Sequence, residues 1–299
     1  MIFHEGTQIV TLVDINASNG QMKHKGSVGV IINSPRDTTH SYRVRFPDGV
    51  EASIKRADFS IRREALAMNI KQGAQDREHD FSQYVIYRCI VGSRAFGLEN
   101  EESDTDLRGI FLPPADLHWS LSGVPEQYES QATEECYWEL QKFLTLALKA
   151  NPNVMECLYT PLVEYTSPLA EELLERREIF LSKIFYQTYN GYVLSQFKKL
   201  EADLRNKGVI KWKHAMHLIR LLISGTILLN EGVLQVRVNE HRERLLAIRN
   251  GQMSWDDIDS WRLELHQDFD EAFLKTKLPD HPDYEAANDL LVRARRTMT

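Results

Sequence analysis

The sequence predicts an α+β protein with a small N-terminal β-barrel, a mixed sheet with helices, and a C-terminal helical domain. Short strand-like runs separated by turn residues fill the first 63 residues, buried-strand patterns recur between residues 84 and 137, and helical periodicity dominates after Trp138. The 299 residues can form two modest domains that each bury a core. We expect domains at 1–63, 83–160 and 161–299, joined after the first by a linker at 64–82.

The first domain is predicted from its turns. The runs QIVTLV, VGVII, YRVRF and EASI are strand-like, and Pro47-Asp48-Gly49 between the last two is a hairpin signal. The pattern KGxxGxI followed by YRVRFPDG resembles SH3-like or KOW-like barrels. Such barrels bind protein or RNA in some settings and only pack in others, so both roles stay open. Residues 1–63 carry a net charge of +3, against −10 for the rest.

The linker at 64–82 is polar and lacks periodicity. Beyond it, strands are expected at Tyr84 to Val91, at Asp106 to Leu112 and within Gln131 to Tyr137. The pattern then becomes helical, with a helix from Glu139 to a stop before Asn151. Further helices are expected near 153–159, 167–183, 184–205, 211–231, 240–249 and 255–274.

Composition excludes several classes of protein. The net charge of −7 argues against a chain-wide electrostatic grip on nucleic acid. The N-terminus lacks the basic flank and apolar core of a secretory signal, and the most apolar stretch, Leu218 to Leu229, is too short to span a membrane. We therefore expect a cytoplasmic protein without membrane association. Cys89, Cys136 and Cys157 lack CxxC spacing and are expected to be reduced core thiols.

The segment GSRAFGLENEESDTDLRGIF carries the chemistry. A Gly-Ser pair ends a buried strand, and Asp104 and Asp106 enter the next. Alternation along a strand places both carboxylates on one face, where they could hold a pair of magnesium ions. Gly92 would let backbone amides approach a phosphate closely, and Ser93 could bind the phosphate at a helix start.

Gly92-Ser93 followed by Asp104-x-Asp106 resembles the signature of the DNA polymerase β nucleotidyltransferase superfamily. The fuller string is similar to a bacterial and phage group of predicted nucleotidyltransferases, in which ELxKFLxLALKxNPNxxExL and the KHAMHLIRLL helix with its following LLNEG also recur. This resemblance spans roughly residues 84–250. Its combined motifs are more specific than an isolated GS or DxD.

The resemblance implies a polymerase-beta-like mixed sheet that binds Mg²⁺ (or Mn²⁺) and a nucleoside triphosphate, with ATP as the expected nucleotide. It implies transfer of a nucleotidyl group to an acceptor hydroxyl with release of pyrophosphate. Asp104 and Asp106 would hold the metals with a third carboxylate, for which the spacing to the next helix favours Glu134 over its neighbour Glu135. The superfamily more often has Asp there. The expected nucleotide-binding residues are Gly92, Ser93, Arg94, Ser103, Arg108, Lys213 and His217.

Each of these residues also has a structural interpretation. The acid-rich stretch 99–106 could be a solvated loop, with Arg94 and Arg108 paired to Glu101 and Glu102. Asn151-Pro152-Asn153 could be a helix stop followed by a fresh N-cap, which would leave Glu156 ordinary. Lys213, His217 and Arg220 share one helical face, which either borders the cleft or is a solvated stripe. His214 and His217 are expected to be structural rather than metal ligands.

Three acceptors remain open at this point: an RNA or tRNA 3′ end, a protein Tyr, Ser or Thr side chain (AMPylation), and a small molecule. The basic balance of the first domain modestly favours a polynucleotide. A different class of function is a non-catalytic protein that senses nucleotide and binds a partner. The sequence indicates neither the acceptor nor the oligomeric state.

Overall fold

The structure is a computed structural model that describes residues 2–35, 37, 40–66, 80–101, 103–130 and 134–298. The chain divides into two compact units, Met1–His79 and Asp80–Thr299. Sheets and helices share the molecule, which confirms the α+β class. Most of the predicted linker, residues 67–79, lies outside the described residues.

The N-terminal unit is an antiparallel sheet with strand order β6-β5-β4-β1-β7. Alternate residues of these strands are buried, and Ile9, Ile31, Val44 and Phe59 form the centre of its core. This period of two is the pattern expected of a sheet with one buried face. The strands are β1 (Gln8–Thr11), β4 (Val28–Asn33), β5 (Tyr42–Arg45), β6 (Glu51–Ile54) and β7 (Phe59–Ile61), with η1 (Arg56–Asp58) before β7 and a separate pair of β2 (Ile15–Asn16) and β3 (Met22–Lys23).

The expected closed barrel is not confirmed. β6 and β7 are the two edges of the five-stranded sheet, and the described strands include no ladder that joins these edges. The hairpin expected at Pro47-Asp48-Gly49 does join β5 to β6, because Tyr42 pairs with Ile54 and Arg45 with Glu51 across it.

The second unit is built around a mixed sheet with strand order β10-β11-β9-β8-β12. β9 lies in the middle, antiparallel to β8 and parallel to β11. The first residue of β9, Asp106, therefore lies beside Val91 at the end of β8. The strands are β8 (Val85–Val91), β9 (Asp106–Phe111), β10 (Gln127–Ser130), β11 (Glu135–Glu139) and β12 (Val163–Thr166). β10 and β12 were not predicted, and β12 brings residues from beyond position 160 into this sheet.

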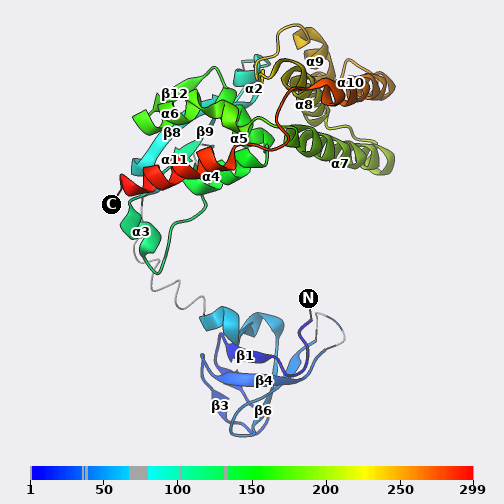
Figure 1. Ribbon diagram of the computed structural model, residues 1–299. Helices are drawn as coiled ribbons and strands as arrows, with labels where there is room; N and C mark the ends of the chain where they lie inside the picture. Colours follow the sequence, from blue (N-terminus) through cyan, green and yellow to red (C-terminus); the bar gives the residue numbers. More distant parts are fainter. Residues whose placement is uncertain are drawn as a thin grey trace. The chain divides into compact units, whose positions relative to one another are not determined.

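Helices cover the sheet and extend into a bundle (Figure 1). The predicted helix near 167–183 is in fact α6 (Pro168–Glu175) followed by η3 (Arg177–Phe180), and α11 was not predicted. The other helices of this unit are η2 (Phe81–Tyr84), α2 (Gly92–Phe96), α3 (Ala115–Trp119), α4 (Leu140–Leu148), α5 (Pro152–Tyr159), α7 (Ile184–Lys207), α8 (Trp212–Glu231), α9 (Arg242–Arg249), α10 (Trp255–Lys275) and α11 (Tyr284–Arg296).

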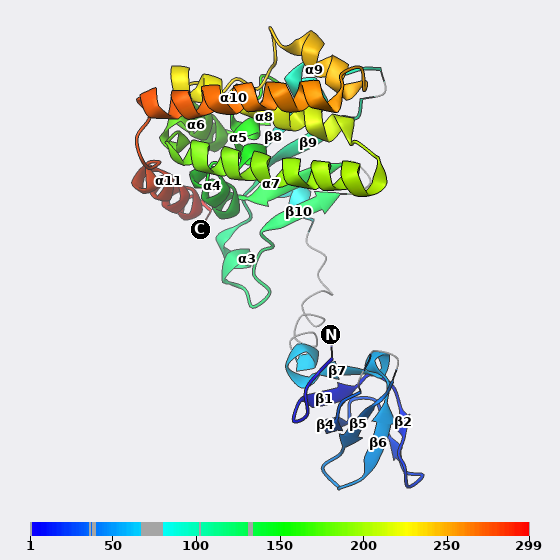
Figure 2. The ribbon, with the colours of Figure 1, turned by 90° about the vertical axis from the view of Figure 1, so that its right-hand side faces the viewer.

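α8 is the central helix of the bundle. It packs against α7, α9 and α10, and Figure 2 shows α7 and α10 running alongside it. Its length from Ala215 to Leu229 is mostly buried, as expected for a helix that is apolar around most of its circumference. After α10 the chain returns to the sheet layer, where α11 lies beside α4 (Figure 1).

A buried ion pair joins the bundle to the sheet layer. Arg220 of α8 is 1% exposed, Glu156 of α5 is 6% exposed, and Arg220 Nη2 donates a hydrogen bond to Glu156 Oε1. The Arg220 guanidinium also lies 3.6 Å from the centre of the Phe96 ring. Burial raises the pKa of the Glu156 carboxyl, and the neighbouring guanidinium opposes this rise. The structural interpretation of the Asn-Pro-Asn segment left Glu156 without a special role. The buried ion pair contradicts that part of the interpretation.

The expected state of the cysteines is confirmed. Cys89, Cys136 and Cys157 are buried free thiols. Within the described part of the chain, no helix combines the length and apolar character needed to cross a membrane.

Removal of Glu156 should destabilise the second unit strongly. A Glu156→Ala variant leaves the Arg220 charge buried without a counter-charge, which we expect to cost about 3–5 kcal/mol. A Glu156→Leu/Arg220→Met double variant removes both charges and should recover most of that loss. All five tryptophans lie in the second unit, so urea unfolding followed by tryptophan fluorescence measures this unit alone. A loss below about 1 kcal/mol in Glu156→Ala would show that the pair does not hold the layers together.

Candidate active site

A pocket of about 770 Å³ lies between the end of the sheet and the first turns of α8. The strand side contributes residues from the ends of β8 and β9 and from the β10–β11 hairpin, and the helix side contributes residues of α5, α8 and α9. The charged and polar lining includes Ser93, Asp106, Arg108, Gln127, Glu129, Asn153, Glu156, Lys211, Lys213, His214, His217 and Arg249.

Gly92 and Asp106 are in direct contact at one wall of this pocket. Gly92 follows β8 at the start of α2, and the last residue of β8, Val91, pairs with Asp106 of β9. Gly92 has a φ of +71°, and a Cβ there would collide with Asp106 Oδ2. Only glycine adopts this conformation readily and also leaves space for the carboxylate. The Gly-Ser pair and the second aspartate of the motif are thus brought together as expected.

Asp104 does not share a strand with Asp106. β9 begins at Asp106, and Asp104 is exposed in the loop before it, so alternation along a strand does not place the two carboxylates. Arg94 holds this loop by donating from Nη2 to Ser103 O (2.9 Å) and from Nε to Asp104 O (3.3 Å). The Ser103 hydroxyl donates to Asn100 Oδ1 at 2.6 Å. Arg94 and Ser103, both expected to bind nucleotide, are therefore engaged in positioning the loop.

Arginines of the α9 region anchor the same loop from the other side. Arg242 Nε donates to Gly97 O at 2.8 Å, and Arg249 Nη1 donates to Leu98 O. The loop that carries Asp104 is therefore tied to the helical bundle. Local sequence patterns do not indicate these contacts, because their partners lie about 150 residues apart.

Arg108 lines the pocket beside Asp106. Its Nη1 donates to Leu107 O and to Glu134 O, both at 2.8 Å, and its Nη2 lies 3.4 Å from Asp106 Oδ1. The structural alternative to nucleotide binding was that Arg94 and Arg108 form ion pairs with Glu101 and Glu102. Glu102 lies outside the described residues, and the bonds above engage both arginines with backbone carbonyls near the two aspartates.

The candidates for the third carboxylate lie at the start of β11. Glu134 is an exposed turn residue with a φ of +54°, and Glu135 is the first residue of β11. Cys136 pairs with Arg108, and both line the pocket, so alternation turns Glu135 to the opposite face of the sheet. The Glu135 carboxylate there accepts a hydrogen bond from Tyr137 OH at 3.1 Å.

A third acidic residue, Glu129, lines the pocket and was not predicted. Glu129 of β10 pairs with Cys136 of β11, which places the two side chains on the same face of the sheet as Arg108. The signal that could have found Glu129 is its alternation with Gln127 in a second strand of the hairpin. That strand was not recognised in the sequence.

This wall contains two carboxylates that are candidate ligands for a divalent cation. Asp106 and Glu129 offer carboxylate oxygens to one pocket, and hard divalent cations prefer oxygen ligands. Among the side chains that the structure describes, no group of three or more His, Cys, Asp or Glu residues is arranged to hold a metal together. Asp104 and Glu134, both predicted metal ligands, are exposed and are not among the residues that line the pocket.

The opposite wall is rich in nitrogen. Lys213 and His217 line it as expected, and Lys211 and His214 join them from the same turns of α8 and its N-terminal end. Arg220, which was expected to share their face, is buried behind the wall in the ion pair with Glu156. The solvated-stripe interpretation is therefore wrong for Arg220.

The start of α5 borders the pocket. Asn151 is the N-cap of this helix, and its Oδ1 accepts hydrogen bonds from Asn153 N (3.1 Å) and Val154 N (3.4 Å). The expected helix stop and fresh N-cap is therefore confirmed. The cap also fixes the edge of the pocket, because both Asn151 and Asn153 line it.

His217 is held in the neutral form. Burial lowers the pKa of its imidazole well below the usual value, and the charges of Arg220, His214 and Lys213 lower it further. Its Nδ1 lies 3.3 Å from Arg220 Nη2, so this nitrogen can accept a hydrogen bond from the guanidinium. A neutral imidazole can hydrogen-bond a ligand but adds no positive charge at neutral pH.

The lowered pKa of His217 should reduce stability in acid. As the pH falls below about 6.5, the unfolded chain binds a proton at this histidine and the folded chain does not. Stability is thus fully present above that pH and is lost as the pH falls toward the folded pKa. Between about pH 7 and pH 5, His217→Gln should lose less unfolding free energy than the wild type, measured by urea unfolding. An exposed-histidine control, His281→Gln, should behave like the wild type. Equal pH slopes for His217→Gln and the wild type would contradict the burial of a neutral ring.

Comparisons with known proteins assign most of this chain to a family. The RlaP family model, described as an RNA repair pathway DNA polymerase beta family, matches residues 63–293, a range that contains every residue lining the pocket. A protein of Bacillus subtilis (strain 168), named uncharacterized protein YcgL, is 23% identical over 218 residues, which cover 67% of this chain and 81% of that protein. The family match covers more than half of the chain. This protein therefore belongs to the RNA repair pathway DNA polymerase beta family.

Proposed function

We propose that the second unit is a Mg²⁺-dependent (or Mn²⁺-dependent) nucleotidyltransferase that moves a nucleoside monophosphate from a triphosphate, with ATP as the favoured donor, to an acceptor hydroxyl. The observation that carries this proposal is the composition of one pocket. Asp106 is pressed against Gly92 on one wall, and Lys211 and Lys213 line the opposite wall. Carboxylates that suit a divalent cation thus share a pocket with cations that suit a triphosphate.

The reaction requires an acceptor oxygen to attack the α-phosphorus while the bond to pyrophosphate breaks. A bound magnesium ion would supply charge neutralisation for the phosphates and would lower the pKa of the acceptor hydroxyl. Asp106 and the neighbouring Asp104 would hold this ion. A third carboxylate would accept the proton of the attacking hydroxyl.

The other predicted site residues have supporting roles. Gly92 allows the backbone to approach a phosphate, and the Ser93 hydroxyl lines the same wall. Lys213 and the neutral His217 face the pocket from α8, where they can bind phosphate oxygens. Arg94 and Ser103 act indirectly, because they position the loop that carries Asp104.

An RNA 3′ hydroxyl is the acceptor that we favour. Membership of a family described by RNA repair supports a polynucleotide over a protein side chain or a small molecule. The net positive charge of residues 1–63 is in keeping with this choice.

Loss of the two aspartates should abolish transfer. An Asp104→Asn/Asp106→Asn variant incubated with α-³²P-labelled ATP, Mg²⁺ and RNA should transfer label at least about a thousandfold more slowly than wild type, because loss of metal binding removes several kcal/mol of transition-state stabilisation. Asp268→Asn on α10, an exposed aspartate, is the matched control and should retain full rate. If wild type binds nucleotide but transfers no label to RNA, protein or small acceptors, the enzyme proposal fails and a nucleotide sensor replaces it.

The identity of the third carboxylate can be resolved by three single variants. Glu134→Gln, Glu135→Gln and Glu129→Gln keep side-chain size and remove one charge each. Sequence spacing favours Glu134 as the third carboxylate, whereas the pocket lining favours Glu129. Glu135 lies on the other face of the sheet, so Glu135→Gln should leave kcat unchanged. The variant that lacks the catalytic carboxylate should lose about 100-fold or more in kcat, with a smaller change in KM for ATP. Full activity in all three would show that two aspartates suffice.

A further inference from the structure

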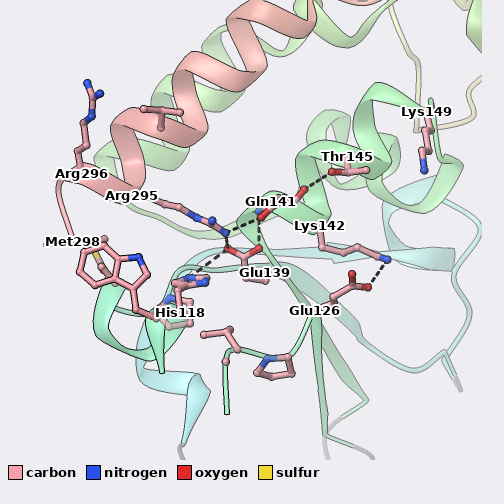
Figure 3. Close-up of a pocket in the computed structure, with 17 residues that line it drawn as sticks. His118, Glu126, Glu139, Gln141, Lys142, Thr145, Lys149, Arg295, Arg296 and Met298 are labelled. Atoms are coloured by element: carbon pink, nitrogen blue, oxygen red, sulfur yellow. Dashed lines mark hydrogen bonds and ion pairs between the residues drawn. The ribbon is translucent and has the colours of Figure 1, made fainter. Parts of the chain in front are cut away.

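A second pocket, of about 920 Å³, lies in the same unit but outside the site described above. Figure 3 shows it between α4, the C-terminal end of α11 and the segment around α3. None of the residues proposed above for catalysis or nucleotide binding lines it. Its lining combines basic side chains with apolar ones, so its role needs a separate explanation.

The floor of this second pocket is a structural carboxylate. Glu139 is buried, its Oε2 accepts a hydrogen bond from Gln141 N at 2.8 Å as the N-cap of α4, and its Oε1 accepts one from Arg295 Nη2 at 3.1 Å. Figure 3 shows Glu139, Gln141 and Arg295 converging there. The negative charge of Glu139 is therefore paired with the Arg295 guanidinium.

The floor also contains two nitrogens without hydrogen-bond partners. Arg295 Nε and His118 Nε2 are buried and unpartnered among the described residues. His118 Nε2 lies 3.7 Å from Glu139 Oε1, which is too long for a hydrogen bond. Unsatisfied buried polar atoms are costly, and small shifts of these side chains toward an occupant would satisfy them.

The rim presents cations and one exposed aromatic ring. Lys142 pairs at 2.6 Å with Glu126, which is 73% exposed, and such exposed pairs hold a lysine only weakly. Lys149 and Arg296 are exposed residues of the same pocket lining, and Trp119, which also lines it, is 73% exposed. Cations that can follow a phosphate backbone next to an aromatic face are the composition of a single-stranded nucleic acid site.

The two pockets share a wall. At three places along the chain, one residue lines the second pocket and its direct neighbour lines the active-site pocket. The second pocket has Glu126, Glu139 and Thr145, and the active-site pocket has Gln127, Trp138 and Leu146. The shared wall is α4 with the β10–β11 hairpin, and a helix is roughly 10 Å across. A chain that occupies the second pocket can therefore extend around this wall into the active-site pocket.

We infer that the second pocket holds an internal segment of the acceptor RNA, with phosphates bound by Lys142, Lys149 and Arg296 and a base stacked on Trp119. This inference rests on the proposed function, because it gives the RNA acceptor a second point of attachment upstream of its reacting 3′ end. A base stacks on an aromatic ring without regard to its identity, so this attachment selects single-stranded RNA without selecting a sequence.

Direct binding tests this inference separately from catalysis. Full-length protein is titrated into a 5′-fluorescein-labelled RNA of about 12 nucleotides, without nucleotide, and anisotropy is followed at several salt concentrations. Trp119→Ala should weaken binding roughly tenfold, and Trp119→Phe should restore most of it. Lys149→Ala/Arg296→Ala should reduce the slope of log K against log salt by about 1.4, because each phosphate that the variant no longer neutralises accounts for about 0.7.

Controls come from exposed residues of the same unit that line neither pocket. Lys275→Ala, at an exposed position 72% accessible, and Tyr284→Ala, 61% exposed, should leave affinity and salt slope unchanged. Transfer assays add a second readout. The pocket variants should raise KM for the long RNA without changing kcat, and transfer to a mononucleoside acceptor, which has no upstream nucleotide to occupy the second pocket, should be unaffected.

The outcomes separate the inference from the proposed function. Equal RNA affinity in wild type and all pocket variants overturns the inference, even if transfer to RNA is observed. Displacement of the RNA by poly-glutamate as readily as by unlabelled RNA also overturns it, because the rim would then bind any acidic chain. Loss of binding in the pocket variants with normal nucleotide affinity supports it, whether or not the transfer assay has identified the acceptor.

Discussion

The buried ion pair between Arg220 and Glu156 is the interaction on which the active-site pocket depends. It fixes α8 against α5, and these two helices supply the pocket wall that faces Asp106. A pair of buried charges is expensive to desolvate, so it persists only when each charge finds its partner in a defined geometry. The guanidinium also packs on Phe96 of α2 and, together with the larger effect of burial, lowers the pKa of the His217 imidazole. One arginine thereby connects the bundle, the Gly92 turn and the basic wall.

Local patterns were sufficient to predict the parts of the site that are continuous in sequence. The strand that ends at Gly92 and the strand that begins at Asp106 were recognisable from their buried residues and turn signals, and the structure brings them together. The spacing of four residues between Lys213 and His217 was likewise sufficient to place both side chains on one helical face, and both line the pocket. The class of fold followed from the change in period after Trp138.

Features that depend on distant partners could not be predicted in this way. The loop before β9 is shaped by Arg242 and Arg249, which are far away in sequence, so nothing local shows that Asp104 lies outside the strand. α11 was missed although Asp283 caps it and Ala287, Leu290 and Ala294 have helical spacing. Its short apolar side chains give a weak signal, and α4, the helix it covers, lies about 140 residues earlier. Glu129 was missed for a different reason: its partner Cys136 is close in sequence, but Tyr128 is the one apolar side chain in its short strand QYES, which gives a weak strand pattern.

The wall shared by the two pockets has a thermodynamic consequence. Coupling between two binding sites is reciprocal, so any factor by which an occupant of one pocket tightens the other must act equally in the opposite direction. α4 contributes to both pockets, and its N-cap carboxylate is bonded to Arg295 of α11. A displacement of this helix by an occupant of one pocket would therefore change the affinity of the other pocket, by the same factor whichever pocket is filled first.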